Sequence, residues 1–238
     1  MKEELRDRYN AVHEAIVQAA RTSGRSVSDI ALLCVTKFHP ISVIFDLLAL
    51  GHRLFGENYV QEAREKSRQL EEAGFDGSSL FHLIGALQRK KASQVVGNFA
   101  MVHSVDSQAL ALALEKACVQ KACTQAILLE VNVGDEAQKA GVNPKDAQAL
   151  AELIQGQCPH LDLQGLMCLP PVFDAGEAAR PYFASLRTLR DELATHTGLP
   201  LPVLSMGMSG DFIQAIEEGA TIVRIGTAIV GPRPVRAV

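Results

Sequence analysis

Two patterns of apolar and polar positions divide the chain. From Glu3 to about Thr22, apolar side chains recur at helical spacing with charges between them, which predicts an amphipathic leading helix. Beyond Gly24, short apolar runs alternate with longer helical stretches, the first of these predicted over about residues 41–50. The short runs predict eight strands, over residues 30–36, 53–55, 80–84, 101–104, 126–132, 163–167, 203–205 and 221–225.

The apolar runs are too continuous for strands with one face in water, so they indicate a parallel sheet covered by helices. Eight such units favour an α/β fold of the (β/α)8 TIM-barrel type with an extra N-terminal helix. An open doubly wound sheet is the alternative, but no glycine-rich fingerprint follows the first strand. No linker-like tract divides the sequence, so residues 1–238 are expected to form a single domain.

Composition narrows the class of protein. Hydrophobic residues make up 47% of the chain and charged residues 21%, which allows a large core without disulfides or metal. A net charge of -4 argues against a dedicated nucleic-acid binder. The five cysteines lack CxxC spacing and are expected to be reduced and mostly buried. Charges alternate at the N-terminus and no segment has the length of a membrane span, so we expect a soluble cytoplasmic protein with no membrane partner.

Lys37 is the first candidate for chemistry, because it directly follows the first predicted strand. Functional groups of α/β barrels gather at the carboxyl ends of the strands, which places the Lys37 amine at the barrel mouth. Partial loss of water lowers the pKa of an ammonium and releases the neutral amine that attacks an aldehyde. Schiff-base chemistry is therefore the functional interpretation, and a solvated loop lysine is the structural one.

Two later segments fall where barrels commonly hold a phosphate, after the seventh and eighth strands. Residues 204–211 run from a strand through Ser205, Met206 and Ser209 into a predicted helix over about residues 211–218, and glycines there permit close approach to an anion. Residues 223–227 place Gly226 and Thr227 as donors and aim Arg224 toward the ligand. Ordinary helix capping and an ordinary turn are the alternatives for each segment taken alone.

Asn58 and His82 also lie at or near predicted strand ends. A ligand contact is one interpretation of His82, and a hydrogen-bonded core histidine is the other. The remaining histidines lack metal-ligand spacing, so no zinc site is predicted. No serine or cysteine triad is indicated, since Cys34 lies in the middle of a strand.

The chain resembles the pyridoxal phosphate homeostasis protein family, whose members bind pyridoxal 5'-phosphate (PLP) and are related to the barrel domain of alanine racemase. The resemblance runs along nearly the whole sequence and rests on these segments: residues 35–37, 55–58, 82–88, 105–106, 130–132, 165–167, 204–209 and 223–227. Two positions depart from the family pattern: Phe81 stands where tryptophan is usual, and Lys90 where asparagine commonly follows Leu-Gln. Both departures concern the pocket rim.

The resemblance implies an alanine-racemase-like barrel in which Lys37 forms the internal aldimine of PLP. It implies that Ser205, Ser209, Gly226 and Thr227 surround the phosphate, with Arg224 facing the pyridine nitrogen. Asn58, His82 and Met206 complete the expected cofactor-binding set.

The same resemblance suggests a PLP carrier or regulator and not an efficient enzyme. A positive Arg224 beside the pyridine nitrogen disfavours ring protonation and weakens the cofactor as an electron sink. The chain ends soon after the last motif, so we do not expect the second domain that completes a racemase. We expect the protein to be a monomer. PLP-dependent apoenzymes are the expected protein partners. The alternatives are a PLP-dependent racemase or decarboxylase of unknown substrate, and a cofactor-free Schiff-base aldolase.

Overall fold

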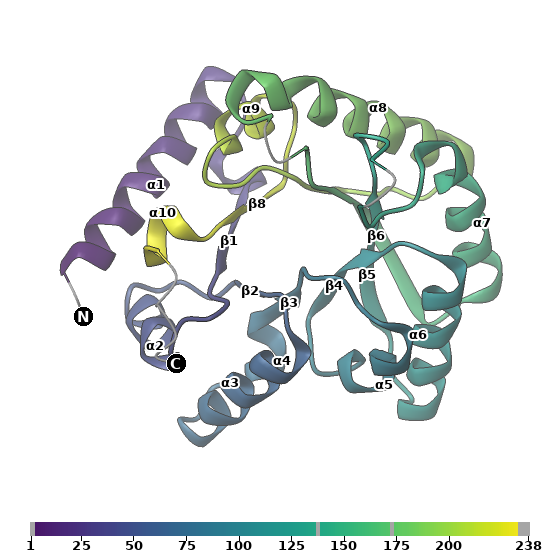
Figure 1. Cartoon of the computed structure of the whole chain (residues 1–238), viewed down its shortest axis with the longest axis horizontal. Coiled ribbons are helices and arrows are strands. Elements are labelled where there is room, and N and C mark those ends of the chain that lie inside the picture. Colours follow the sequence, from purple (N-terminus) through teal and green to yellow (C-terminus); the bar gives the residue numbers. More distant parts are fainter. Residues whose placement is uncertain (1–2, 137–138, 172–173, 233–238) are drawn as a thin grey trace.

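The computed structural model describes residues 3–136, 139–171 and 174–232. Its strands form one closed parallel barrel in the order β1 to β8, each paired with the next and β8 with β1 (Figure 1). The predicted (β/α)8 barrel is confirmed. The strands are β1 (Ala31–Val35), β2 (Phe55–Glu57), β3 (Phe81–Leu83), β4 (Met101–Val105), β5 (Gln125–Val131), β6 (Leu161–Cys168), β7 (Val203–Ser205) and β8 (Ile222–Ile225).

Helices cover the outside of the barrel. They are α1 (Glu3–Thr22), α2 (Ile41–Ala49), α3 (Val60–Glu72), α4 (Gly77–Leu80), α5 (Ala92–Val95), α6 (Gln108–Lys121), α7 (Ala147–Gln157), α8 (Arg180–Thr197), α9 (Phe212–Glu217) and α10 (Thr227–Val230), with 3-10 turns η1 (Val27–Asp29), η2 (Arg89–Lys91), η3 (Pro144–Asp146) and η4 (Gly176–Ala179). In the part of the chain that the structure describes, no helix combines the length and apolarity that crossing a membrane requires.

The predicted leading helix is α1, which packs against α9 and α10 beside the closing strands (Figure 1). Its inward side chains, such as Val12 and Ile16, are buried. Arg8 Nε donates to Ile229 O over 2.7 Å, and Arg25 Nη1 donates to Ile216 O and Ala220 O, each over 2.8 Å. The helix and Arg25, which follows it, thus hold the N-terminal segment against the last units of the barrel.

The second strand is the clearest boundary difference. It was predicted over residues 53–55 but extends over Phe55–Glu57. Arg53 instead donates back through Nη1 to Leu48 O in the last turn of α2 and to His52 O beyond it, each over 2.8 Å, which satisfies carbonyls at the end of the helix and after it. The strand therefore begins later and carries Glu57 to the carboxyl end of the barrel.

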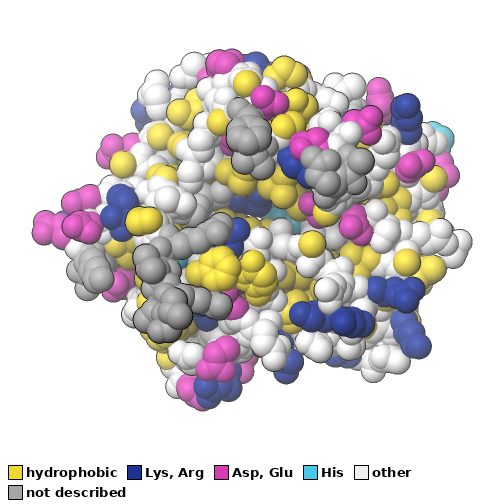
Figure 2. All heavy atoms as spheres, in the orientation of Figure 1, with side chains coloured by type: hydrophobic (Ala, Val, Ile, Leu, Met, Phe, Trp, Pro, Cys, Tyr) yellow, Lys and Arg dark blue, Asp and Glu magenta, His cyan; other side chains and the backbone are white. Residues whose placement is uncertain are grey.

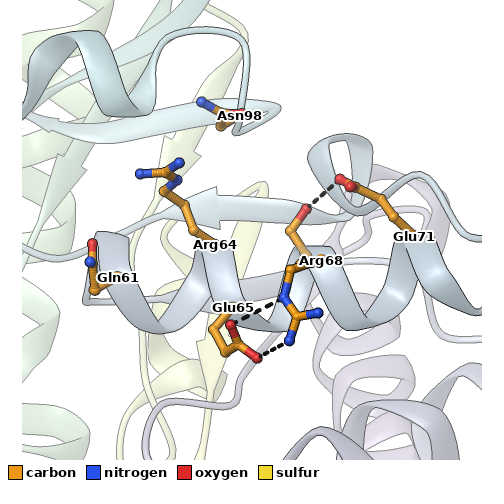
Figure 3. Close-up of a pocket in the computed structure, with 7 residues that line it drawn as sticks. Gln61, Arg64, Glu65, Arg68, Glu71 and Asn98 are labelled. Carbon is orange, nitrogen blue, oxygen red and sulfur yellow. Dashed lines mark hydrogen bonds and ion pairs between the residues drawn. The ribbon is translucent and has the colours of Figure 1, made fainter.

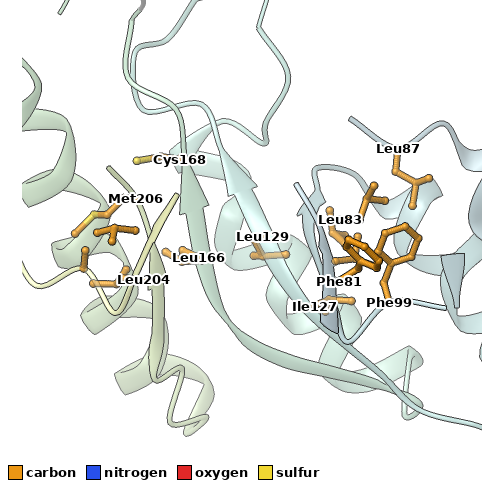
Figure 4. Close-up of a cluster of buried hydrophobic side chains, with 14 of the residues drawn as sticks. Phe81, Leu83, Leu87, Phe99, Ile127, Leu129, Leu166, Cys168, Leu204 and Met206 are labelled. Carbon is orange, nitrogen blue, oxygen red and sulfur yellow. The ribbon is translucent and has the colours of Figure 1, made fainter. Parts of the chain in front are cut away.

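Alternate strand residues face the helices and the barrel interior. Figure 4 shows part of the outer layer, where Phe81 and Leu83 of β3, Ile127 and Leu129 of β5, and Leu166 of β6 are buried beneath the helices. A separate inner cluster consists of Leu33, Val35 and Ile222. This alternation decides which polar side chains reach the interior.

Candidate functional site

A cavity of about 620 Å³ opens at the carboxyl ends of the strands. Figure 2 shows this face hollowed near the middle of the molecule, where hydrophobic side chains meet basic and acidic ones. Six of the nine residues predicted for the site line the cavity: Lys37, Asn58, Ser209, Arg224, Gly226 and Thr227. These six come from loops or strands separated by up to 190 positions in the sequence, so barrel closure is what brings them together.

Arg224 lies on the inward face of β8, is only 3% exposed and reaches the cavity wall. Its guanidinium donates through Nη1 to Ser205 Oγ and through Nη2 to Cys168 O, each over 2.8 Å. Burial lowers the pKa of Arg224, an effect that the neighbouring Cys168, Glu130 and Asp211 oppose. Hydrogen bonds to β7 and β6 therefore fix the direction of the guanidinium, which β8 carries.

Ser205 and His82 lie behind this arginine, outside the residues that line the cavity. The Ser205 hydroxyl is fully buried and lies 3.0 Å from His103 Nδ1, while His103 Nε2 is 2.9 Å from His82 Nδ1. Burial lowers the pKa of His82 to about 4 and that of His103 well below its usual value. Both imidazoles are neutral near pH 7, so a chain of neutral groups spans the barrel and ends on Arg224.

The Met206 side chain points away from the barrel interior, opposite to that of Ser205. Its side chain is fully buried in the outer hydrophobic layer with Leu204, as Figure 4 shows, and its N–H donates to Ile222 O over 3.1 Å. The structure therefore places the Met206 side chain in the core and away from the cavity.

The predicted anion-binding segments meet on one side of the cavity. Ser209 and Gly210 from the loop after β7 line it together with Gly226 and Thr227 from the turn after β8. Ala228 N–H donates to Ser209 Oγ over 3.4 Å, and Met208 N–H donates to Asp211 Oδ1 over 2.6 Å. Gly207 has φ +90, and a Cβ there would lie 2.5 Å from Ala215 Cβ, so this loop needs glycine to pack against α9.

Asn58, which follows β2, contributes a buried acceptor to the cavity lining. Its Oδ1 is buried and has no hydrogen-bond partner among the described residues. The neighbouring loop approaches so closely that a Cβ on Gly85 would lie 2.3 Å from Asn58 O. A buried polar atom without a partner costs roughly 1–3 kcal/mol, and a ligand in the cavity could remove this cost by donating to Asn58.

Glu130 is a cavity residue that the sequence prediction missed. It lies on β5, is 5% exposed and lines the same cavity as Lys37 and Arg224. Burial, with a smaller contribution from Asp106, raises its pKa to about 7, against the lowering effect of Arg224. A charged residue inside the otherwise apolar run 126–131 was the signal that could have revealed it.

The state of the cysteines and the grouping of possible metal ligands are further features of the described residues. All five cysteines are free, and burial raises the pKa of Cys168 to about 12, so its thiol is not a nucleophile near pH 7. Among the residues that the structure describes, no group of three or more histidine, cysteine or acidic side chains could hold a metal ion.

Comparison with known proteins first identifies the class of protein to which the chain belongs. Residues 13–234 match the family described as alanine racemase, N-terminal domain, and the chain belongs to it. An alanine racemase of Clostridium difficile shares the fold with a TM-score of 0.74 at 16% identity, over 99% of this chain and 58% of that one.

Closer relatives identify the particular family. Pyridoxal phosphate homeostasis proteins of Aquifex aeolicus and Vibrio cholerae are each 40% identical to this chain, covering 95% and 92% of it and 97% and 92% of their own lengths. The structure of PipY from Synechococcus elongatus with PLP bound has a TM-score of 0.78 at 36% identity, over 91% of this chain and 100% of that one. The chain belongs to the pyridoxal phosphate homeostasis protein family.

Proposed function

We propose that this protein binds PLP in the cavity at the barrel mouth, covalently through Lys37, and acts in PLP homeostasis as a carrier or regulator. The observation that carries the proposal is that Lys37, Arg224 and the Ser209 and Gly226–Thr227 loops line one cavity. The structure of PipY with PLP bound adds support from a relative.

The cavity fits the cofactor in size and in chemistry. About 620 Å³ lies within the range of small-molecule sites. The site combines an amine, a guanidinium, hydroxyl groups and the unpartnered Asn58 Oδ1. When bound, PLP supplies an aldehyde that forms a carbon–nitrogen double bond with a primary amine. Lys37 would provide that amine, and Ser209, Gly226 and Thr227 would hold the phosphate.

Arg224 would face the pyridine nitrogen, held there by Ser205 and the Cys168 carbonyl. In this assignment Ser205 acts on the cofactor through Arg224, and His82 supports the same chain through His103. Met206 would contribute through the fold of its loop. Because a fixed positive charge opposes protonation of the ring, the cofactor remains a weak electron sink. A weak electron sink favours storage of PLP over turnover.

Glu130 favours a second candidate function, a PLP-dependent racemase or decarboxylase. A cavity carboxyl with a pKa raised to about 7 can exchange a proton at neutral pH and could act beside Lys37 as a second acid–base group. The carrier proposal requires instead that Glu130 meets no substrate Cα–H bond.

Incubation of the PLP-loaded protein with L-amino acids in D2O distinguishes the two functions. The carrier predicts no deuterium at Cα by NMR and no D-enantiomer by chiral chromatography above the level given by free PLP. Rapid Cα exchange that Glu130→Gln abolishes would establish the enzyme. The full proposal, a cytoplasmic monomer that passes PLP to dependent apoenzymes, adds that an apo-transaminase should regain activity from the loaded protein.

A further inference from the structure

A buried network of charged side chains lies under α3, on the outer side of the barrel wall from the cavity. Lys66 of α3 has 6% of its side chain exposed, and its Nζ is 2.7 Å from Glu57 Oε1 and 2.7 Å from Glu62 Oε1. Nζ also donates to Thr36 O over 2.8 Å. All three N–H donors of the ammonium are therefore used.

The network holds the backbone on both sides of Lys37. Before it, the Thr36 carbonyl accepts from Lys66, and Thr36 Oγ1 donates to Glu57 Oε1 over 2.7 Å. After it, Phe38 N–H donates to Glu62 Oε1 over 2.6 Å. Residues of β2 and α3 thereby fix the segment that follows β1.

Phe38 needs this support because its φ is +67, in the left-handed region. For a residue with a Cβ, and above all for a bulky one, this conformation costs roughly 1–2 kcal/mol. The bond to the Glu62 carboxylate is charge-assisted, the stronger kind of hydrogen bond. The Phe38 ring also packs 5.2 Å from that of Tyr59. The chain turns at Phe38, directly after the residue that lines the cavity.

Stability alone does not explain the network. Glu57 is fully buried, its Oε2 has no hydrogen-bond partner among the described residues, and burial raises its pKa against the effect of Lys66. Burying such a pair generally gives no more stability than apolar residues of similar volume would. What these residues do provide is a fixed position for Thr36 and Phe38.

We propose that Glu57, Glu62 and Lys66 are positioning residues, which hold the turn at Phe38 so that the Lys37 amine points into the cavity. This inference rests on the proposed function, in which Lys37 is the amine that binds PLP. None of the three residues lines the cavity. Glu62 and Lys66 bond to the residues on either side of Lys37, whereas Glu57 also directly precedes the cavity residue Asn58, so Glu62 is the member whose effect on PLP is expected to pass through Lys37.

A double-mutant cycle between Glu62→Gln and Lys37→Ala tests this. Glu62 is the network member of choice, because 23% of its side chain is exposed and its loss leaves the Glu57–Lys66 pair intact. The matched control is Glu65→Gln on the same helix. Glu65 pairs with Arg68 at 2.7 Å (Figure 3), and both side chains are exposed. Urea unfolding establishes that each variant is folded.

Glu62→Gln should weaken PLP binding on the order of 10-fold, the size of a lost charge-assisted hydrogen bond, and slow the appearance of the Lys37-dependent absorbance band. In the Lys37→Ala background the same change should leave PLP affinity unaltered. Pyridoxamine 5'-phosphate, which has no aldehyde, should bind equally to wild type and Glu62→Gln. Glu65→Gln should change none of these.

Two results would overturn the positioning role: equal weakening of PLP binding with and without Lys37, or no effect of Glu62→Gln on a wild type that forms the band. Absence of the band in folded wild type is a different result, which would remove the proposed function itself.

Discussion

The buried carboxyl of Glu130 leads to a sharp prediction about stability and pH. Replacing it by glutamine keeps the shape but removes the titrating proton. In the folded protein burial raises the Glu130 pKa from 4.5 to about 7. Between these values the folded state holds a proton that the unfolded state has released. This proton binding stabilises the folded state relative to a protein whose Glu130 is ionised. The stabilisation is fully present below about pH 4.5 and is lost as pH rises through about 7.

The magnitude follows from the two pKa values. At 1.36 kcal/mol per pH unit, the interval from 4.5 to about 7 corresponds to about 3 kcal/mol. Because glutamine is neutral at every pH, Glu130→Gln should match wild type near pH 4.5. It should become more stable than wild type as pH rises, by up to about 3 kcal/mol at pH 8.5.

Urea unfolding of the apoproteins at half-unit steps from pH 4.5 to 8.5 measures this difference directly. Glu14→Gln, on the exposed side of α1, is the control and should stay within about 0.5 kcal/mol of wild type throughout. A Glu130→Gln variant that is less stable than wild type at pH 8.5 would refute the reasoning. It would mean that Glu130 forms a buried ion pair with Arg224, whose rupture costs several kcal/mol.

Two further predictions concern packing and the site. Gly165→Ala should lower the free energy of unfolding by about 3 kcal/mol or more, because φ is +152 and a Cβ would lie 1.9 Å from Val203 O. Gly156 in α7 has open space around it, so Gly156→Ala should raise the free energy of unfolding by about 0.5–1 kcal/mol. Comparable losses of stability in Gly165→Ala and Gly156→Ala would contradict this expectation. Ser205→Ala should cost about 1–3 kcal/mol, since Arg224 and His103 each lose a buried partner, and should weaken PLP binding. Unchanged PLP affinity would show that Ser205 does not act through Arg224.

Much of the barrel was predictable because parallel strands buried on both faces appear as continuous apolar runs. All eight runs became strands, and only short ones such as β2 shifted in position. Position in the barrel also predicted Lys37 and Arg224, whose place at strand ends indicated the mouth.

The sequence prediction was weaker where a contact with the cavity depends on the direction of a side chain. Ser205 and Met206 are adjacent, so strand alternation sends one side chain inward and the other outward, and neither lines the cavity. The Glu57–Lys66 network could not be foreseen, because its residues look like ordinary charges on a strand end and a helix until the fold brings them together. Long-range pairing of this kind has no local signature.

The central claim is that Lys37 binds PLP covalently, and the absorbance spectrum tests it most directly. Purified wild type with added PLP should show a band near roughly 420 nm that borohydride removes, and Lys37→Ala should lack it. A folded wild type without a PLP-dependent band, or an undiminished band in Lys37→Ala, would contradict the account.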